Sequence, residues 1–581
     1  MACPSPHMVN LEKVVIVAGD AELAEQVCSR LRKPGFYLPV IEAPTVRLVK
    51  YGVFDADCIR VSNAVRALKP KTVLFLRLDP QVAAKLKSCF PEIQPVLVGA
   101  FDESLLLTHI KFTQKTIGYR DLLTDDSNSR SSDLFVVEGE FDVSHVIAAN
   151  LAVAHNGRVI SIAEVLDDEV DFLKEKSRTW SNGLPDEKKQ AREAVMQFAR
   201  ARLPMWLLDS SDAKSISFIT RGVPYGVLPF HCPSTHYFSF PLLGLSVLSG
   251  MLKSQAHVRC PIVVLIDPNT VGQSEFETLR KTFGVAGYHL RLAYGGGATI
   301  QNTTYLCQFL PSDFIFFSTH CGELDGHRIV ERFPDRQGKS HEICYDRALS
   351  ICPSPGSDLF EVVVLYIPIS MDGVSWTDDA AKKRINAGEL MEDFVQHTGA
   401  NNEISEGREI ITIVESKRMK GFEALKMSDG NYFPMPRMVG GCHYPVVFNN
   451  ACSSWRGQSM EFGCNGASVY IGTATDVLNP VAVIVASSFT KAVTTGKSIG
   501  TALFRSQKKF TEQFGYTPYL MHGYLYTSLP NPMPRLSHPR VVERLLSAIE
   551  AVKRLPSSNK HTAALNCLEQ ELSGLLNITK H

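Results

Sequence analysis

The chain has 581 residues, too many for one hydrophobic core, and this length predicts about three or four domains. A hydrophobic content of 45% and a charged content of 21% are those of an ordinary globular protein. Lysine plus arginine and aspartate plus glutamate number 60 each. This balance argues against a dedicated nucleic-acid-binding or membrane-surface protein, since both need a basic face.

Cysteine usage and the first residues bear on the compartment. The 14 cysteines are scattered without a CxxC pair, which suits a reducing cytoplasm better than a disulfide framework. Residues 1–11 contain no basic segment followed by an apolar core, so no signal peptide is expected. No apolar run approaches the ~18 residues of a membrane span. We therefore expect a cytoplasmic protein with no membrane partner.

Residues 1–125 are expected to form a small α/β module. A strand over Val14–Ala18 is followed by Asp20, which can cap a helix over Ala21–Leu31. Further buried strands are predicted, the first over Val73–Leu76. Strands alternating with helices predict a parallel, Rossmann-like sheet. The glycine fingerprint of dinucleotide binding is absent. A structural or sensing role is favoured, and binding of a small ligand is the alternative.

Residues 126–205 are expected to form a second α/β segment that connects this module to the rest of the chain. The polar stretch 121–133 predicts a linker ahead of it. An amphipathic helix is predicted over Val143–His155, with Asn156 and Gly157 as its C-terminal cap. Residues 181–190 are charged and are predicted to be a loop.

Two stretches within residues 206–535 carry the reactive side chains. Asp313–Gly322 and Tyr444–Ser454 are each an apolar run of strand length that stops at a reactive residue, His320 in the first and Cys452 in the second. Residues just past the ends of buried parallel strands line the crevice where α/β sheets bind ligands. If the two strands are neighbours, one thiol and one imidazole share that edge. A thiol beside an imidazole can become a thiolate, the nucleophile of acyl transfer.

A long insertion separates these two stretches. It includes a predicted strand over Glu361–Pro368 and a half-exposed strand over Glu409–Glu415, while residues 328–350 are charged and are predicted to be irregular. Insertions of this length form active-site lids or partner-binding surfaces more often than inert loops. Residues 536–581 are predicted to be a C-terminal helical tail with apolar residues at a spacing of three to four.

Several segments together resemble the CHAT domain, the caspase-like peptidase class that includes separase. They are NACSS at 450–454, GASVYIGT at 466–473 and GKSIGTAL at 496–503, with STHCG at 318–322 similar to the His-Gly segment of the family. The resemblance covers roughly residues 206–530. It implies a multidomain α/β protein in which a caspase-like sheet domain with a long insertion and C-terminal helices follows the N-terminal module.

The resemblance also implies a role for each site residue in amide hydrolysis. Cys452 would attack the scissile carbonyl, and His320 would hold the proton and pass it to the leaving amine. Backbone N–H groups of Cys452 and of Cys321 or Gly322 would form the oxyanion hole. Cys321 is a rival thiol, but adjacent residues of an extended strand point to opposite faces. Separase-like members carry an acidic residue near Asp476, which implies a pocket for an arginine or lysine side chain.

Alternatives accompany each of these assignments. Asp476 could instead be a turn or helix-capping residue. The family usually has glycine directly after the histidine, and Cys321 in that place favours a catalytically inactive caspase-like scaffold or regulator. The remaining potential metal ligands fit no Cys/His finger spacing, so no metal or cofactor is expected; these residues are His320, Cys321, His327, Cys344, Cys352, Cys442 and His443.

The favoured hypothesis is a regulated cysteine endopeptidase. CHAT peptidases often occur in multidomain proteins, and bacterial members resemble effectors of antiphage defence that a partner switches on. By this analogy we expect a protein substrate and an activating protein or small ligand, with no direct nucleic-acid binding. Cleavage after arginine or lysine follows from the proposed role of Asp476.

Overall fold

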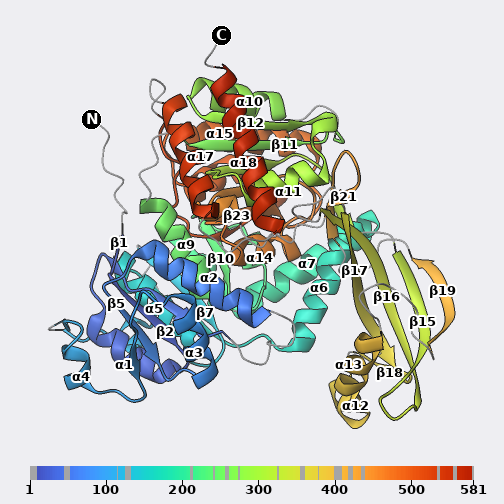
Figure 1. Cartoon of the computed structure of the whole chain (residues 1–581), viewed down its shortest axis with the longest axis horizontal. Helices are drawn as coiled ribbons and strands as arrows, with labels where there is room; N and C mark the ends of the chain where they lie inside the picture. The colour runs from blue at the N-terminus through green and yellow to red at the C-terminus, as the bar shows by residue number, and fades with distance from the viewer. Residues whose placement is uncertain are drawn as a thin grey trace.

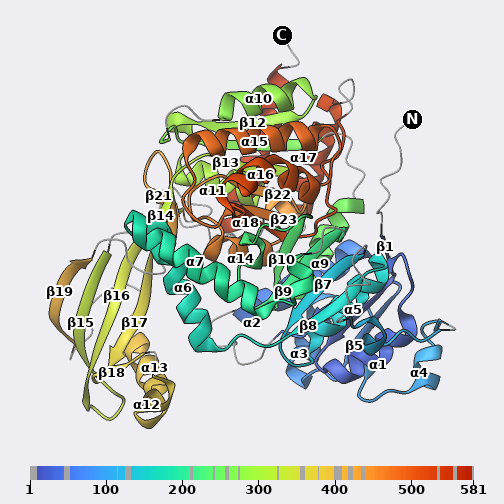
Figure 2. The same ribbon diagram turned by 180° about the vertical axis from the view of Figure 1, so that it is seen from behind.

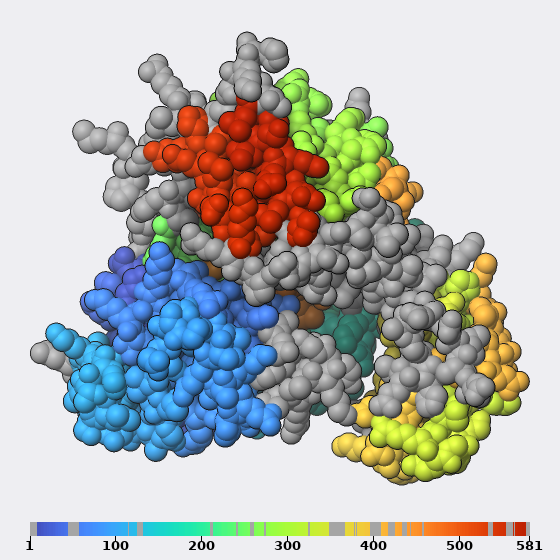
Figure 3. Space-filling view, in the orientation of Figure 1, coloured from blue at the N-terminus to red at the C-terminus, as the bar shows by residue number. Residues whose placement is uncertain are grey.

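The protein is a multidomain α/β fold with three parts, an N-terminal module, a central domain built on a large sheet, and an insertion (Figure 1). The structure, a computed structural model, describes residues 9–44, 53–113, 115–124, 132–209, 213–239, 242–255, 261–271, 275–323, 326–353, 360–376, 378–397, 408–416, 423–432, 439–532, 537–553 and 559–578. Residues 125–131 of the predicted linker lie outside these ranges. Figure 3 shows the blue N-terminal module and the yellow insertion at separate ends of the molecule.

The N-terminal module contains a four-stranded parallel sheet, as the sequence predicts. In sheet order its strands are β4 (Val40–Glu42), β2 (Val14–Ala18), β5 (Thr72–Leu76) and β6 (Val96–Val98). A two-stranded ladder joins β1 (Asn10–Leu11) to β3 (Phe36–Tyr37). Its helices are α1 (Ala21–Leu31), α2 (Val53–Leu68), α3 (Pro80–Cys89) and α4 (Glu103–Leu107). The predicted cap of α1 is confirmed, because the carboxylate of Asp20 accepts the N–H of Leu23 at 2.8 Å.

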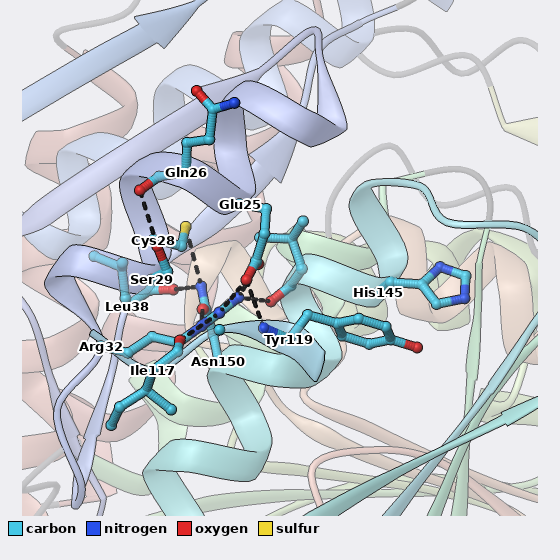
Figure 4. A network of polar contacts seen from close by, with 12 residues as sticks. Glu25, Gln26, Cys28, Ser29, Arg32, Leu38, Ile117, Tyr119, His145 and Asn150 are labelled. Carbon is cyan, nitrogen blue, oxygen red and sulfur yellow. Dashed lines mark hydrogen bonds and ion pairs between the residues drawn. The ribbon is translucent and has the colours of Figure 1, made fainter. Parts of the chain in front are cut away.

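A buried arginine joins this module to the central domain (Figure 4). Arg32, at the end of α1, is 2% exposed and forms a two-pronged ion pair with Glu25 at 2.7 and 2.5 Å. Its Nε donates to Asn150 Oδ1 at 2.7 Å, and Asn150 Nδ2 donates to the carbonyl of Leu38 at 2.9 Å. Asn150 belongs to α5 (Val143–His155) of the central domain. Because a buried charge must be paired, these contacts hold the module in one orientation on α5.

The central domain is built on one ten-stranded sheet. In sheet order its strands are β12 (His289–Tyr294), β11 (Ile262–Asp267), β13 (Phe314–Phe317), β22 (Val446–Asn449), β23 (Val469–Thr473), β24 (Tyr519–Gly523), β10 (Ser234–Phe238), β9 (Ser215–Thr220), β7 (Asp133–Glu138) and β8 (Arg158–Ile162). Strands β7 and β8 come from the segment 126–205, so the sheet extends across the boundary that the sequence suggested at residue 205.

Strand direction reverses once across this sheet. The five strands from β12 to β23 are mutually parallel, β24 pairs antiparallel with β23, and the strands from β24 to β8 are parallel to one another. The edge where β13 and β22 end is therefore also the edge where β24 and β10 begin. Side chains of β22 alternate between two cores, with Val446 and Phe448 in one and Val447 in the other. A strand buried on both faces is what its continuous apolar sequence predicts.

Helices cover both faces of the large sheet (Figures 1 and 2). Beside β13 and β22, one face carries α10 (Phe276–Val285), α15 (Asn479–Thr494) and α16 (Ile499–Phe514). The core of the other face includes residues of α6 (Asp167–Asn182), α7 (Pro185–Arg202), α11 (Ile300–Gln308), α14 (Arg456–Cys464), α17 (Ser537–Lys553) and α18 (Asn559–Ile578). The central domain also contains α8 (Met205–Leu208) and α9 (Leu243–Gln255). None of the helices within the described ranges has the length and apolar character needed to cross a membrane.

The predicted loop over residues 181–190 is wrong. Helix α6 ends at Asn182 and α7 begins at Pro185, so only a short turn separates them. Proline suits the first turn of a helix because it needs no N–H partner there, and Glu187 accepts the N–H of Leu184 at 2.8 Å. The two helices form an antiparallel pair, the α6–α7 hairpin, over residues 167–202.

The insertion forms two antiparallel sheets between β13 and β22. The larger, in sheet order, has β18 (Val374–Ser375), β17 (Phe360–Met371), β16 (Ser340–Pro353), β15 (Gly326–Pro334) and β19 (Glu409–Ser416), and the smaller has β14 (Cys321–Glu323), β20 (Glu423–Lys426) and β21 (Asn431–Tyr432). Helices α12 (Asp379–Arg384) and α13 (Ala387–His397) accompany them. The prediction that 328–350 is irregular is wrong, because these residues form most of β15 and β16, whose apolar residues, Ile329 and Phe333 among them, face a separate small core.

Candidate active site

Strands β13 and β22 are neighbours, and this pairing brings the two reactive residues to one edge of the sheet. The pair is parallel, with Phe317 opposite Asn449. His320 and Cys452 each lie three residues beyond this register pair. Neighbouring strands lie about 4.8 Å apart, so the two chain segments leave the sheet side by side.

His320 is exposed and is oriented by a backbone carbonyl. Its Nε2 lies 3.1 Å from the carbonyl oxygen of Thr270, which follows β11, the other neighbour of β13. A carbonyl oxygen can only accept, so Nε2 carries a proton in this contact. In the neutral ring Nδ1 then holds the lone pair, which makes Nδ1 the atom that can act as a base.

Cys452 is half-buried and its thiol is protonated in this arrangement. The Sγ–H donates to the carbonyl oxygen of Val477 at 3.8 Å. Burial raises the pKa of the thiol, the contact with Val477 lowers it, the carboxylate of Asp476 raises it and the ammonium of Lys188 lowers it, and the net pKa is above the ordinary value. Among the described residues, no hydrogen bond joins Cys452 to His320, since each side chain is bonded to a backbone carbonyl.

The turn that carries Cys452 is held rigidly by the next strand. Thr473 of β23 donates its hydroxyl to the carbonyl of Ala451 at 2.7 Å, and Tyr470 donates to the carbonyl of Ser454 at 2.7 Å. The hydroxyl of Ser454 turns back to the carbonyl of Asn449 at 3.0 Å. Ser453 has a φ of 51°, in the left-handed region that side chains rarely adopt. These bonds fix a sharp turn directly after β22.

The same turn leaves a candidate oxyanion donor. The N–H groups of Ala451 and Ser453 have acceptors, the side chain of Asn449 and the carbonyl of Thr475. Within the described part of the chain, the N–H of Cys452 has none. Backbone N–H groups near a nucleophile are the usual donors to a developing oxyanion. The other predicted donors, Cys321 and Gly322, lie in β14, where they pair with Leu425 and Ala424 of β20. Gly322 is exposed, with open space where a side chain would lie.

Cys321 faces away from the imidazole beside it. Its Sγ accepts a hydrogen bond from Gln458 Nε2 at 3.2 Å, and the side chain packs against the core on that face of the sheet. His320 instead contacts the carbonyl of Thr270. The opposite directions of these neighbouring side chains agree with the expectation from strand geometry.

A buried glutamate bridges the ends of the two strands. Glu275, just ahead of α10, is 4% exposed and accepts a hydrogen bond from Asn450 Nδ2 at 2.5 Å. It also hydrogen-bonds to Ser318, which follows β13. Burial raises its pKa against the effect of these donors. Tyr519 completes the cluster, donating its hydroxyl to Asn450 Oδ1 at 2.6 Å. Glu275 thus ties the residue after β13 to the residue after β22.

Asp476 lies next to the Cys452 turn and pairs with a lysine. Its Oδ2 is 2.8 Å from Lys188 Nζ of α7, and its Oδ1 accepts from the hydroxyl of Ser453 at 3.4 Å. It does not cap the following helix, because the cap position of α15 is Leu478 and no side chain caps that end. Asp476 therefore does not cap a helix, as one alternative predicted. It lies in the loop between β23 and α15.

Two comparisons with known proteins do not identify a family for this chain. A scan against protein-family models found no match, and a search of curated proteins found none either. Within the described ranges no group of three or more His, Cys, Asp or Glu side chains could hold a metal ion. The chemistry of the site therefore has to be inferred from the residues themselves.

Two residues at the site were not found from the sequence. Glu275 lies at the start of α10, where an acidic residue is common for electrostatic reasons alone, so it carries no distinct signal. Lys188 lies in the stretch taken for a loop. A signal for its helix was present, since Pro185 followed by Asp186 and Glu187 is typical of a helix N-terminus.

Proposed function

We propose that this protein is a cysteine endopeptidase of the caspase-like CHAT class. The observation that carries the proposal is the parallel pairing of β13 with β22, which brings His320 and Cys452 to one edge of one sheet. The exposed imidazole and the rigid turn after β22 support it. The N–H of Cys452, which has no acceptor among the residues that the structure describes, supports it as well.

The proposed reaction uses these residues in sequence. Cys452 Sγ attacks the carbonyl carbon of the scissile peptide, and its proton passes to Nδ1 of His320. The oxyanion receives the N–H of Cys452 and a donor from the Cys321–Gly322 segment. Collapse breaks the C–N bond, and the leaving amine takes the proton from His320. Water then hydrolyses the thioester, with His320 as its base.

The reaction requires a rearrangement of the two side chains. Both are hydrogen-bonded to carbonyls, Cys452 to Val477 and His320 to Thr270. The proposed reaction needs a rotation about the Cys452 side chain that turns Sγ away from Val477 and toward Nδ1 of His320. Catalytic hydrogen bonds often tighten only when substrate binds, so a separated resting pair is compatible with catalysis.

A second candidate function is a catalytically inactive scaffold. The raised pKa of Cys452 and the bonding of both side chains to other groups favour it. A structural cysteine at a strand end has this environment, since burial suppresses the thiolate. The two candidates differ in whether Cys452 reacts with a carbonyl-like electrophile in a manner that depends on His320.

A peptide electrophile with arginine before its reactive carbon tests the proposal, applied to the full chain at neutral pH and read by mass spectrometry of the labelled peptide. We expect labelling of Cys452 that is lost in Cys452→Ala and slowed at least ~100-fold in His320→Ala, the usual size of an acid–base contribution. Cys321→Ala is the matched control, because it removes the rival thiol and keeps the backbone N–H of that segment, so it should keep the wild-type rate. An equal rate of Cys452 labelling in wild type and His320→Ala, or equal labelling of Cys321 and Cys452, would favour the scaffold.

A further inference from the structure

The α6–α7 hairpin lies against the turn that carries Cys452. Ser181, at the end of α6, receives a hydrogen bond from the hydroxyl of Ser453 at 2.7 Å. The hydroxyl of Thr475 donates to the carbonyl of Trp180 at 3.4 Å. Figure 2 shows α6 and α7 running together from the sheet toward the insertion. The turn between the two helices is therefore held beside the residue after the nucleophile.

The first turn of α7 places a cation at the candidate substrate pocket. Lys188 Nζ is 2.8 Å from Asp476 Oδ2, with side-chain exposures of 35% and 46%. An ammonium at this carboxylate stands where the arginine or lysine of a substrate would bind. Lys188 projects from a helix whose backbone is hydrogen-bonded internally, so its own peptide bond is not presented to Cys452.

We propose that Lys188 is an internal competitor for the basic side chain of the substrate, and that the α6–α7 hairpin keeps the site in a resting state. The inference rests on the proposed function and adds its regulation. Lys188 forms an ion pair with the carboxylate of Asp476, and Ser181 accepts a hydrogen bond from the hydroxyl of Ser453, next to the nucleophile. Substrate binding then requires displacement of the lysine.

The hairpin makes two kinds of contact with the rest of the domain. The anchor is the packing of Trp180 and Arg192 on Tyr516, and the latch is the Lys188–Asp476 ion pair. Trp180 is 5% exposed and packs edge-on against Tyr516 with ring centroids 5.3 Å apart. Arg192 of α7 lies over the same tyrosine ring at 5.4 Å. The Lys188–Asp476 pair is instead partly exposed, and such pairs contribute little to stability. The latch can therefore open while the anchor stays in place, and a substrate arginine that binds both carboxylate oxygens can displace the lysine.

Removal of Lys188 changes the reactivity of Cys452 in two opposite ways. This separates the effect of Lys188 as a competitor at Asp476 from the effect of its charge on the thiol. The ammonium lowers the pKa of the Cys452 thiol, so its loss makes the thiol less reactive toward a small neutral reagent such as iodoacetamide. Loss of a competitor makes the thiol more reactive toward a probe that needs Asp476. Only the competitor model predicts that the two reagents respond in opposite directions.

The test compares the full-length wild type, Lys188→Ala, Lys188→Arg and Lys189→Ala. Lys189 is the matched control, since it is an exposed lysine one residue further along the same helix. The probe is the arginine peptide electrophile, and a second peptide with norleucine in place of arginine reports on reactions that do not use Asp476. Intact-protein melting temperatures confirm that each variant is folded.

We expect Lys188→Ala to react with the arginine probe about two- to fivefold faster than wild type, the size that a partly exposed ion pair allows. Lys188→Arg and Lys189→Ala should keep the wild-type rate, and the norleucine probe and iodoacetamide should react no faster with Lys188→Ala. Equal arginine-probe rates in wild type and Lys188→Ala, with labelling that still depends on His320, would overturn the competitor and leave the peptidase. Absence of His320-dependent labelling in every protein would overturn both.

Discussion

We predict that Glu275 fixes the distance between the segments that carry His320 and Cys452. Its carboxylate is the common acceptor for Asn450, two residues before Cys452, and Ser318, two residues before His320. Replacement by alanine removes a side chain that hydrogen-bonds to both of these donors. We expect both lower stability and a lower rate of Cys452 labelling, because the ends of β13 and β22 lose their bridge.

The magnitude follows from the two donors left behind. A buried donor that loses its acceptor costs about 1–3 kcal/mol, so Glu275→Ala should lower the free energy of unfolding by roughly 2–6 kcal/mol. Glu275→Gln keeps one acceptor oxygen for the Asn450 amide and should cost about half as much. For the reaction, a displacement of about 1 Å between reacting groups can lower a rate by ~100-fold. A ~100-fold lower rate corresponds to about 2.7 kcal/mol, so the rate effect of Glu275→Ala should be comparable with its effect on stability, and Glu275→Gln should show a smaller loss of both.

Urea unfolding and the labelling rate of the arginine probe measure these two effects. Glu277→Ala is the matched control, because Glu277 lies two residues away and makes an exposed pair with Arg280 at 2.9 Å. An exposed pair of this kind contributes little to stability. If Glu275→Ala and Glu277→Ala lower stability equally, the bridge does not stabilise the site. If Glu275→Gln labels at the wild-type rate, the bridge does not set the spacing of Cys452 and His320.

Two further predictions concern Asp476 and the buried His236. We expect Asp476→Ala to abolish cleavage of peptides after arginine or lysine and to leave other cleavages in place, as measured by cleavage mapping; equal loss everywhere would reject the pocket. Burial lowers the pKa of His236 to about 4, and its neutral ring donates from Nδ1 to Met521 and accepts the N–H of Gly226 at Nε2. The stability that this neutral ring contributes should be complete above about pH 6.5, the pKa of an unfolded histidine, and lost as the pH falls toward 4. Urea midpoints over this range measure the loss, and an NMR titration in which His236 protonates near 6.5 would contradict it.

Local sequence patterns predicted elements whose signals are complete within a few residues. Helices Ala21–Leu31 and Val143–His155 have the bounds expected from their caps, Asp20 at one start and Asn156, with a φ of 55°, at the other end. The continuous apolar runs ending near His320 and Cys452 became buried parallel neighbours. In these cases propensity, capping and burial all favour the same structure, so the sequence alone was sufficient.

The insertion was harder to predict because its strands are exposed on one face. Residues 328–350 carry many charges, which suggested an irregular segment, yet they form most of β15 and β16. In an antiparallel sheet with one solvated face, charged residues are common at outward positions. The charged Glu331 of β15 is an exception, since it is 2% exposed and is paired with Arg408. Ile329 and Phe333 lie inward, at positions four residues apart that keep the strand period of two.

The contacts around Cys452 and Asp476 join segments that lie far apart in the sequence, and no local pattern encodes them. Lys188 and Asp476 are 288 residues apart, and Ser181 and Ser453 are 272 apart. Each residue taken alone is an ordinary polar side chain on a helix or a turn. Their juxtaposition follows from the packing of α6 and α7 onto the sheet, which Trp180 anchors from within the core. A sequence can therefore indicate candidate reactive residues, as it did for Cys452 and His320, while the groups that contact them from distant segments become visible only when the chain is folded.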